Sequence, residues 1–132
     1  MPRILLAEDH LDLRTLLDMN FTMRGFTVIA VEDGQAALEQ LESANPDALV
    51  TDLMMPRLDG TGLCRAVRAD PRFAGLPILV LTAADDETRR EVALLPGVRV
   101  LRKPPSFKDL APIVQEMIDN HERSRSAPSS PD

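Results

Sequence analysis

The sequence has no tryptophan, no tyrosine and one cysteine, and aromatic residues make up only 3% of its 132 positions. The core must therefore consist of aliphatic side chains, which the hydrophobic share of 44% can supply. The single cysteine, Cys64, excludes an internal disulfide and fits a reducing compartment, so we expect a cytoplasmic location. No apolar run approaches the ~20 residues of a membrane span, and no signal-peptide pattern opens the chain.

Charge and length limit the organisation of the chain and its classes of partner. The net charge of −6 disfavours nucleic acid and anionic membranes, so we expect neither as a direct partner. The length suits one domain with a substantial core. Serine, proline and arginine near the end cannot bury enough surface to fold. We therefore expect one domain over 1–122 and a disordered tail or linker over 123–132.

Short apolar runs alternate with segments of helical spacing along the chain. The runs are typical of strands, and they cover residues 4–7, 26–31, 49–52, 77–81 and 98–101. The run at 49–52 is typical of a strand buried on both faces, whereas 98–101 alternates. Strands alternating with helices predict βαβ units and a parallel sheet with both faces covered. The expected fold is a flavodoxin-like (βα)5 three-layer α/β sandwich, with strand order 2-1-3-4-5.

Helix limits and faces follow from caps and apolar spacing. Asp33 and Ser106 suit N-cap positions, and the helix after residue 85 should run out at Pro96-Gly97. The spacing predicts that the first helix buries Leu13, Leu16, Leu17 and Phe21.

Acidic residues stand at the ends of two predicted strands. Glu8 and Asp9 follow the first strand, and Asp52 ends the third. The predicted order makes them neighbours at the carboxyl edge, where open α/β sheets bind ligands. Taken alone, Asp52 can equally be a solvated acid that begins a turn. Together the three carboxylates repel one another; Lys103 can offset part of this charge, and a hard cation such as Mg²⁺ would offset more.

Other metal and nucleophile candidates are weaker. Neither His10 nor His121 has a partner at ligand spacing, which argues against zinc and favours surface positions for both. Cys64 is interpreted as a small packing residue. Met54 is expected to approach a cation through its backbone carbonyl rather than its sulfur.

Four motifs occur in order, each at the end of a predicted strand. They are Glu8-Asp9, Asp52 with Met55-Pro56 and Asp59-Gly60, Thr82-Ala83, and Lys103-Pro104. From about Arg3 to about His121, the chain thereby resembles the receiver domain of bacterial two-component response regulators. The resemblance implies a phosphorylation-activated signalling switch in a phosphorelay rather than a turnover enzyme.

The resemblance also implies a role for each motif. Asp52 is the expected phosphoacceptor, Thr82 the hydroxyl that moves to bond the phosphoryl group, and Lys103 its ion-pair partner. The peptide before Pro104 is the expected cis bond of the family. The implied Mg²⁺ ligands are Glu8, Asp9, Asp52 and the Met54 carbonyl. On the residues alone, Thr82 can instead cap the next helix, and Lys103 can be a surface lysine.

One position departs from the family pattern. Receiver domains usually carry a tyrosine or phenylalanine on the fifth strand, three residues before the lysine, where this chain has Val100. The usual inward swing of that ring is therefore impossible here. Either coupling between phosphorylation and output runs through Thr82 and loop movement alone, or the output surface is unusual.

Two other function classes are weaker. A haloacid-dehalogenase-like phosphatase also uses an aspartate nucleophile and Mg²⁺, but its family motif is Asp-x-Asp directly after the first strand. In this chain Asp52 ends the third strand, and Met54 stands in the place of the second acid. A nucleotide-binding module is disfavoured because the glycine-rich phosphate-binding motifs are missing.

The resemblance also implies partners. We expect a sensor histidine kinase or phosphotransfer protein as phosphodonor. An output partner is expected on the face formed by the fourth helix, fifth strand and fifth helix, and the chain is expected to be a monomer or weak dimer.

Overall fold

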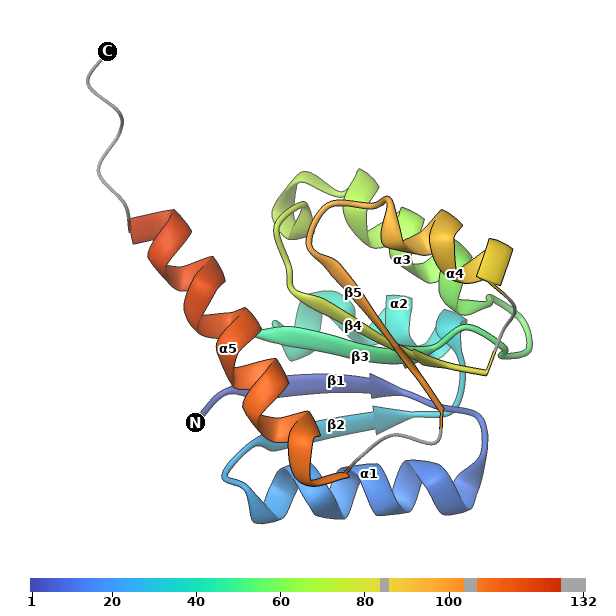
Figure 1. Cartoon of the computed structure of the whole chain (residues 1–132), viewed down its shortest axis with the longest axis horizontal. Helices are drawn as coiled ribbons and strands as arrows, with labels where there is room; N and C mark the ends of the chain where they lie inside the picture. Colours follow the sequence, from blue (N-terminus) through green and yellow to red (C-terminus); the bar gives the residue numbers. More distant parts are fainter. Residues whose placement is uncertain (84–85, 104–106, 127–132) are drawn as a thin grey trace.

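The computed structural model describes residues 1–83, 86–103 and 107–126. Within these ranges a parallel sheet has the strand order β2-β1-β3-β4-β5 (Figure 1). The strands are β1 (Arg3–Ala7), β2 (Thr27–Val31), β3 (Ala48–Asp52), β4 (Ile78–Thr82) and β5 (Val98–Arg102). The helices are α1 (Leu11–Met23), α2 (Gly34–Ala44), α3 (Gly60–Ala69), α4 (Asp86–Ala93) and α5 (Phe107–Ser126), with a 3-10 turn η1 (Pro71–Phe73). The predicted fold class and strand order are confirmed.

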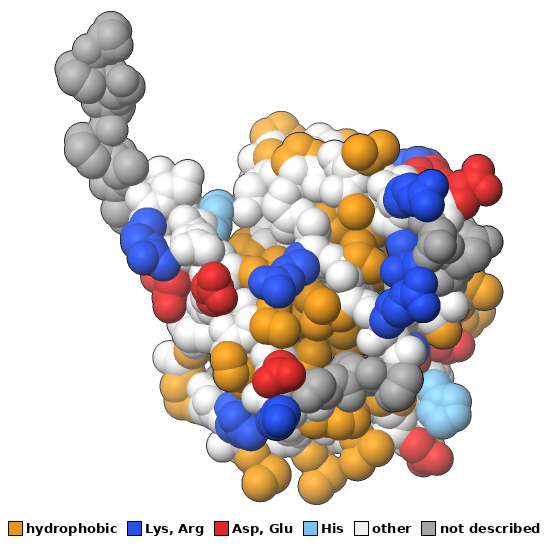
Figure 2. All heavy atoms as spheres, in the orientation of Figure 1, with side chains coloured by type: hydrophobic (Ala, Val, Ile, Leu, Met, Phe, Trp, Pro, Cys, Tyr) orange, Lys and Arg blue, Asp and Glu red, His pale blue; other side chains and the backbone are white. Residues whose placement is uncertain are grey.

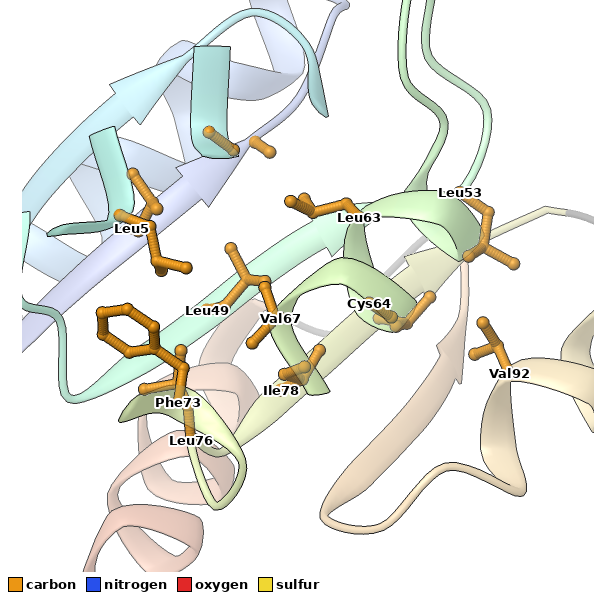
Figure 3. Packing of buried hydrophobic residues seen from close by; sticks show 14 residues of the cluster. Leu5, Leu49, Leu53, Leu63, Cys64, Val67, Phe73, Leu76, Ile78 and Val92 are labelled. Carbon is orange, nitrogen blue, oxygen red and sulfur yellow. The ribbon is translucent and has the colours of Figure 1, made fainter. Parts of the chain in front are cut away.

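Two aliphatic clusters cover the opposite faces of the sheet. Alternation along each strand separates them, so Leu49 belongs to one cluster and its neighbour Val50 to the other. The first cluster packs α2, α3 and α4 onto the sheet (Figure 3). The second packs α1 and α5 onto the other face. Every residue of β3 and β4 is buried, which explains why these strands read as continuous apolar runs.

Local chemistry sets the helix limits. The Asp33 and Asp59 side chains cap α2 and α3, each accepting a backbone N–H at 2.8 Å. Asn45 ends α2 in the left-handed region with φ 43°, and Gly25 follows α1 with φ 95°. The expected cap at Ser106 lies outside the described residues.

Two expectations, about α1 and α4, differ from the structure. Leu16 was expected to be buried, but it is exposed, because the buried face of α1 turns toward the sheet through Leu17 and Phe21. Helix α4 ends at Ala93, before the proline expected to stop it. Helix α5 continues to Ser126, and the division into a domain over 1–122 and a tail over 123–132 stays a prediction. Within the part of the chain that is described, no helix has the length and apolarity needed to cross a membrane.

Candidate functional site

The predicted site residues meet at the carboxyl edge of the sheet. Glu8 and Asp9 directly follow β1, while Asp52 and Thr82 are the last residues of β3 and β4. Lys103 directly follows β5. Because the strands are parallel and β1, β3, β4 and β5 are successive neighbours, their ends bring these side chains to one edge.

The three carboxylates form one cluster. Glu8, Asp9 and Asp52 each offer an oxygen, and these oxygens all lie within 4.8 Å of one another. Glu8 is only 1% exposed and Asp52 only 5%, whereas Asp9 is open to solvent. Carboxylate oxygens that converge with one side open to water suit a hard divalent cation that keeps part of its hydration shell.

Lys103 joins two of these acids. Its Nζ lies 3.0 Å from Glu8 Oε1 and 2.9 Å from Asp52 Oδ2, and its side chain is 19% exposed. The sequence predicted Lys103 at this edge, but it gave no sign that the lysine contacts Glu8 as well as Asp52. The ammonium therefore offsets the charge of two acids at once.

Burial and charge shift the acid–base equilibria at this edge. Burial raises the pKa of Glu8 above its ordinary value, although hydrogen bonds from the His10 N–H and Lys103 oppose the shift. Burial alone would lower the pKa of Lys103, but its bonds to Asp52 and Glu8 outweigh this effect, so the pKa is raised. The two acids thus stabilise the ammonium form of Lys103.

Backbone contacts fix the end of β3. Asp52 Oδ1 accepts the Leu53 N–H at 2.7 Å, and the Leu53 carbonyl accepts the Gly60 N–H at 2.9 Å. A Cβ on Gly60 would collide with the Asp52 carbonyl, so the first residue of α3 must be small. The Met54 side chain points into solvent. The Met54 backbone carbonyl as a ligand stays a prediction.

Thr82 is fully buried at the end of β4, and its carbonyl accepts the Lys103 N–H at 3.0 Å. The ends of β4 and β5 are thus tied together beside the acids. Val100 lies one strand further out, opposite Val80, and is half-buried against α4. The predicted cis peptide at Pro104 lies outside the described residues.

Of the residues set aside as structural, Cys64 and His10 lie where they were expected and His121 does not. Cys64 is fully buried in the core, and burial raises the pKa of its thiol to about 12, so it is inert as a nucleophile. His10 is an exposed N-cap of α1, accepting the Leu13 N–H at 3.4 Å. His121 is half-buried, which differs from the expected surface position, because its ring packs over Gly75.

Sequence reasoning missed one residue beside the site, Arg57, which forms an ion pair with Asp33. Arginine in a polar loop carries no spacing signal, and its partner lies 24 residues away. The cap function of Asp33 was visible in the sequence, but its second bond was not.

Comparison with protein families identifies the class. The model of the response regulator receiver domain matches residues 4–115, and the chain belongs to this family. The chain is thus a signalling receiver domain, and the haloacid-dehalogenase alternative is not supported.

Individual relatives agree with this class. The chain is 43% identical over 109 residues to the response regulator MprA of Mycobacterium ulcerans and 41% identical to that of Mycobacterium tuberculosis H37Ra. Each match covers 82% of this chain but only 46% of the relative. The chain therefore spans about half the length of the curated relatives it matches.

Solved structures share the fold along nearly their whole length. A sensor protein from Polaromonas is 34% identical with a TM-score of 0.83, and the match covers 91% of this chain and 98% of that one. The chemotaxis protein CheY4 of Vibrio cholerae is 26% identical with a TM-score of 0.81, covering 89% and 98% respectively.

Proposed function

We propose that this receiver domain accepts a phosphoryl group on Asp52 from the phosphohistidine of a sensor kinase or phosphotransfer protein. The observation that carries the proposal is the position of Lys103, whose Nζ bridges Asp52 and Glu8 within the acidic cluster. In the reaction, an Asp52 oxygen bonds to phosphorus as the bond from phosphorus to the histidine nitrogen breaks. The electron pair of that bond returns to the imidazole, which takes up a proton.

Asp52, Lys103 and Thr82 have different roles in the proposed transfer. Asp52 provides the nucleophile without needing a base, because a carboxylate is already ionised at neutral pH. Lys103 is placed to pair with the new phosphoryl charge once the Asp52 carboxylate has been consumed. Thr82, at the neighbouring strand end, is proposed as the hydroxyl that bonds a phosphoryl oxygen.

Glu8, Asp9, Asp52 and the Met54 carbonyl are the proposed holders of Mg²⁺. The donor set fits this ion because it consists of oxygens only, with solvent access on the side of Asp9. When bound, Mg²⁺ would neutralise negative charge on the phosphoryl oxygens. Glu8, whose burial raises its pKa, would gain a counter-charge beyond Lys103.

The output surface is proposed to lie on α4, β5 and α5. Figure 2 shows basic side chains spread over this face, between apolar ones. A hollow of about 390 Å³ is lined by Arg89, Arg90, Ala93 and Val100, at the place where family members usually have an aromatic ring. Leu94, directly after α4, is largely exposed. The chain is proposed to act through this face as a monomer or weak dimer.

Acetyl phosphate with Mg²⁺ should add one phosphoryl group to the wild-type protein, seen as an increase in intact mass that acid or hydroxylamine removes. Asp52→Asn should remain unmodified, because the amide is not a nucleophile for phosphoryl transfer. Asp59→Asn is the matched control, since asparagine keeps the N-cap of α3 in the same loop. Modification of Asp52→Asn to the wild-type level would refute the assignment. Continuous turnover of a phosphate monoester by the wild-type protein would contradict a switch role.

A further inference from the structure

The loop after the proposed phosphoacceptor contains a strained turn. Arg57 has φ 68°, a left-handed conformation that a residue with a side chain rarely adopts. The Leu58 N–H donates to the Pro56 carbonyl at 2.8 Å, closing a ring around Arg57. A bond between residues two apart with positive φ between them is the pattern of a γ-turn of the rare, strained kind. Such a turn persists only when its surroundings hold it.

An ion pair holds the turn from the side of α2. Arg57 Nη2 lies 2.6 Å from Asp33 Oδ2, and its Nε donates to the same oxygen at 2.9 Å. The Asp33 side chain is 5% exposed, although that of Arg57 is 60% exposed. The other Asp33 oxygen accepts the Ala36 N–H at 2.8 Å. One buried carboxylate therefore both caps α2 and binds the loop.

The backbone of α2 also touches this loop. A Cβ on Gly34, the first residue of α2, would collide with the Leu58 carbonyl. Gly60, the first residue of α3, makes the same kind of close approach to the Asp52 carbonyl at the other end of the loop. The loop from 53 to 59 is thus confined between the N-termini of two helices, and Asp33–Arg57 is the side-chain bond that closes the α2 side.

We propose that Asp33 and Arg57 are positioning residues that lock the loop carrying the Met54 carbonyl, so that this carbonyl faces the cation before the cation binds. The inference rests on the proposed function, in which the Met54 carbonyl of this loop is a Mg²⁺ ligand. Among the described residues, the hydrogen bonds and ion pairs of Asp33 and Arg57 join them to each other and to the start of α2, not to the acids of the site. Their effect is indirect: the pair holds the γ-turn, and the turn sets the path of the backbone from Asp52 to Gly60.

The test uses substitutions that spare the fold. Asp33→Asn keeps an N-cap for α2 but loses the charge that attracts Arg57. Arg57→Asn tolerates positive φ better than arginine, so it relieves strain while removing the bond. Arg57→Lys keeps the positive charge as a partial rescue. Arg72→Asn is the control, because it removes an ion-paired arginine at the opposite end of the sheet.

Two measurements are made on the full chain. Amide hydrogen exchange at Leu58 and Gly60, without Mg²⁺, reports the order of the loop. Titration with Mg²⁺ alone, followed by NMR, reports the affinity. Asp33→Asn and Arg57→Asn should each speed exchange and weaken Mg²⁺ binding about tenfold, the lower end of the effect of groups behind metal ligands. Arg57→Lys should fall between, Arg72→Asn should match wild type, and the double variant should be no worse than the worse single variant.

The outcomes separate the alternatives. Exchange and affinity that change together support the lock. A lower melting temperature with unchanged exchange at Leu58 and unchanged Mg²⁺ affinity overturns it, because the pair would then be only a stabilising contact. Faster exchange with unchanged affinity also overturns it. A wild-type protein that binds no Mg²⁺ overturns the proposed function, and with it the task of the lock; this failure is recognisable because it occurs before any substitution.

Discussion

At the scale of single residues, Glu8 is an acid whose burial opposes its ionisation. Its carboxylate is almost fully buried, and burial raises its pKa although Lys103 lies 3.0 Å away. A carboxyl whose pKa is raised by folding binds its proton more tightly in the folded state than in the unfolded chain. Its ionisation therefore costs stability in the metal-free protein.

The pH dependence of stability should reveal this cost. The contribution of protonated Glu8 is fully present below its ordinary pKa of 4.5 and is lost as pH rises through the raised folded value. The glutamine in Glu8→Gln cannot ionise. The free energy of unfolding of this variant, relative to that of wild type, should therefore increase between pH 4.5 and neutrality. Urea unfolding of both metal-free proteins across this range measures the difference.

The prediction concerns how the difference in free energy of unfolding changes with pH. It does not concern the difference at any one pH, because Glu8→Gln also loses the ion pair with Lys103. Glu39→Gln serves as the control, since Glu39 is exposed on α2. Stability curves for wild type and Glu8→Gln that stay parallel from pH 4.5 upward would show that burial does not disturb this carboxyl.

At the scale of elements, we expect the route from the site to the proposed output face to run along β4 and β5. Their carboxyl ends are joined by the bond from the Lys103 N–H to the Thr82 carbonyl. Val100, further along β5, has no ring to rotate, and its branched side chain has few rotamers. A ligand shifts an equilibrium only through contacts that differ between the two states. If phosphorylation shifts such an equilibrium, we therefore expect the difference to lie near Thr82 rather than at Val100.

Beryllofluoride, a phosphoryl mimic, should produce large amide shifts in NMR spectra near Asp52, Thr82 and Lys103. Shifts at residues 98–100 should be smaller. Thr82→Ala should remove most of the distant response while leaving phosphoryl transfer to Asp52 intact, because the hydroxyl is not the nucleophile. Thr27→Ala, an exposed position on β2, is the control. The largest shifts along β5, preserved in Thr82→Ala, would point to a different route.

At the scale of the whole molecule, the acidic cluster exists only when the sheet is complete. Glu8 and Asp9 follow β1, and Asp52 is at the end of β3. In the sequence, α1, β2 and α2 lie between them. An ion that binds this arrangement binds only the folded state. Its binding free energy is therefore added to the free energy of unfolding.

Mg²⁺ should accordingly raise the melting temperature of the wild-type protein. The expected gain is about 2.7 kcal/mol when Mg²⁺ is at about 100 times its Kd. Asp9→Asn should gain much less, and without metal it should melt higher than wild type because one repelling charge is removed. Asp12→Asn, an acid in the first turn of α1, is the control. Equal Mg²⁺-induced shifts in wild type and Asp9→Asn would argue against Asp9 as a ligand.

The sequence by itself determined the strands, their order and the edge at which the acids meet. These features follow from local patterns: apolar runs in 49–52 and 77–81, a cap such as Asp33, and acids placed directly after strands. A parallel sheet then brings the strand ends together whatever the details of packing.

Only the tertiary structure decided which side chains touch. Lys103 reaches Glu8 across 95 positions of chain, and Arg57 reaches Asp33 across 24. The exposure of Leu16 and the half-burial of His121 likewise depend on how α1 and α5 are set against the sheet. The physical reason is one of scale. Periodicity and capping are short-range, so the sequence displays them, whereas a side-chain contact depends on the relative position of elements that only the packed core fixes.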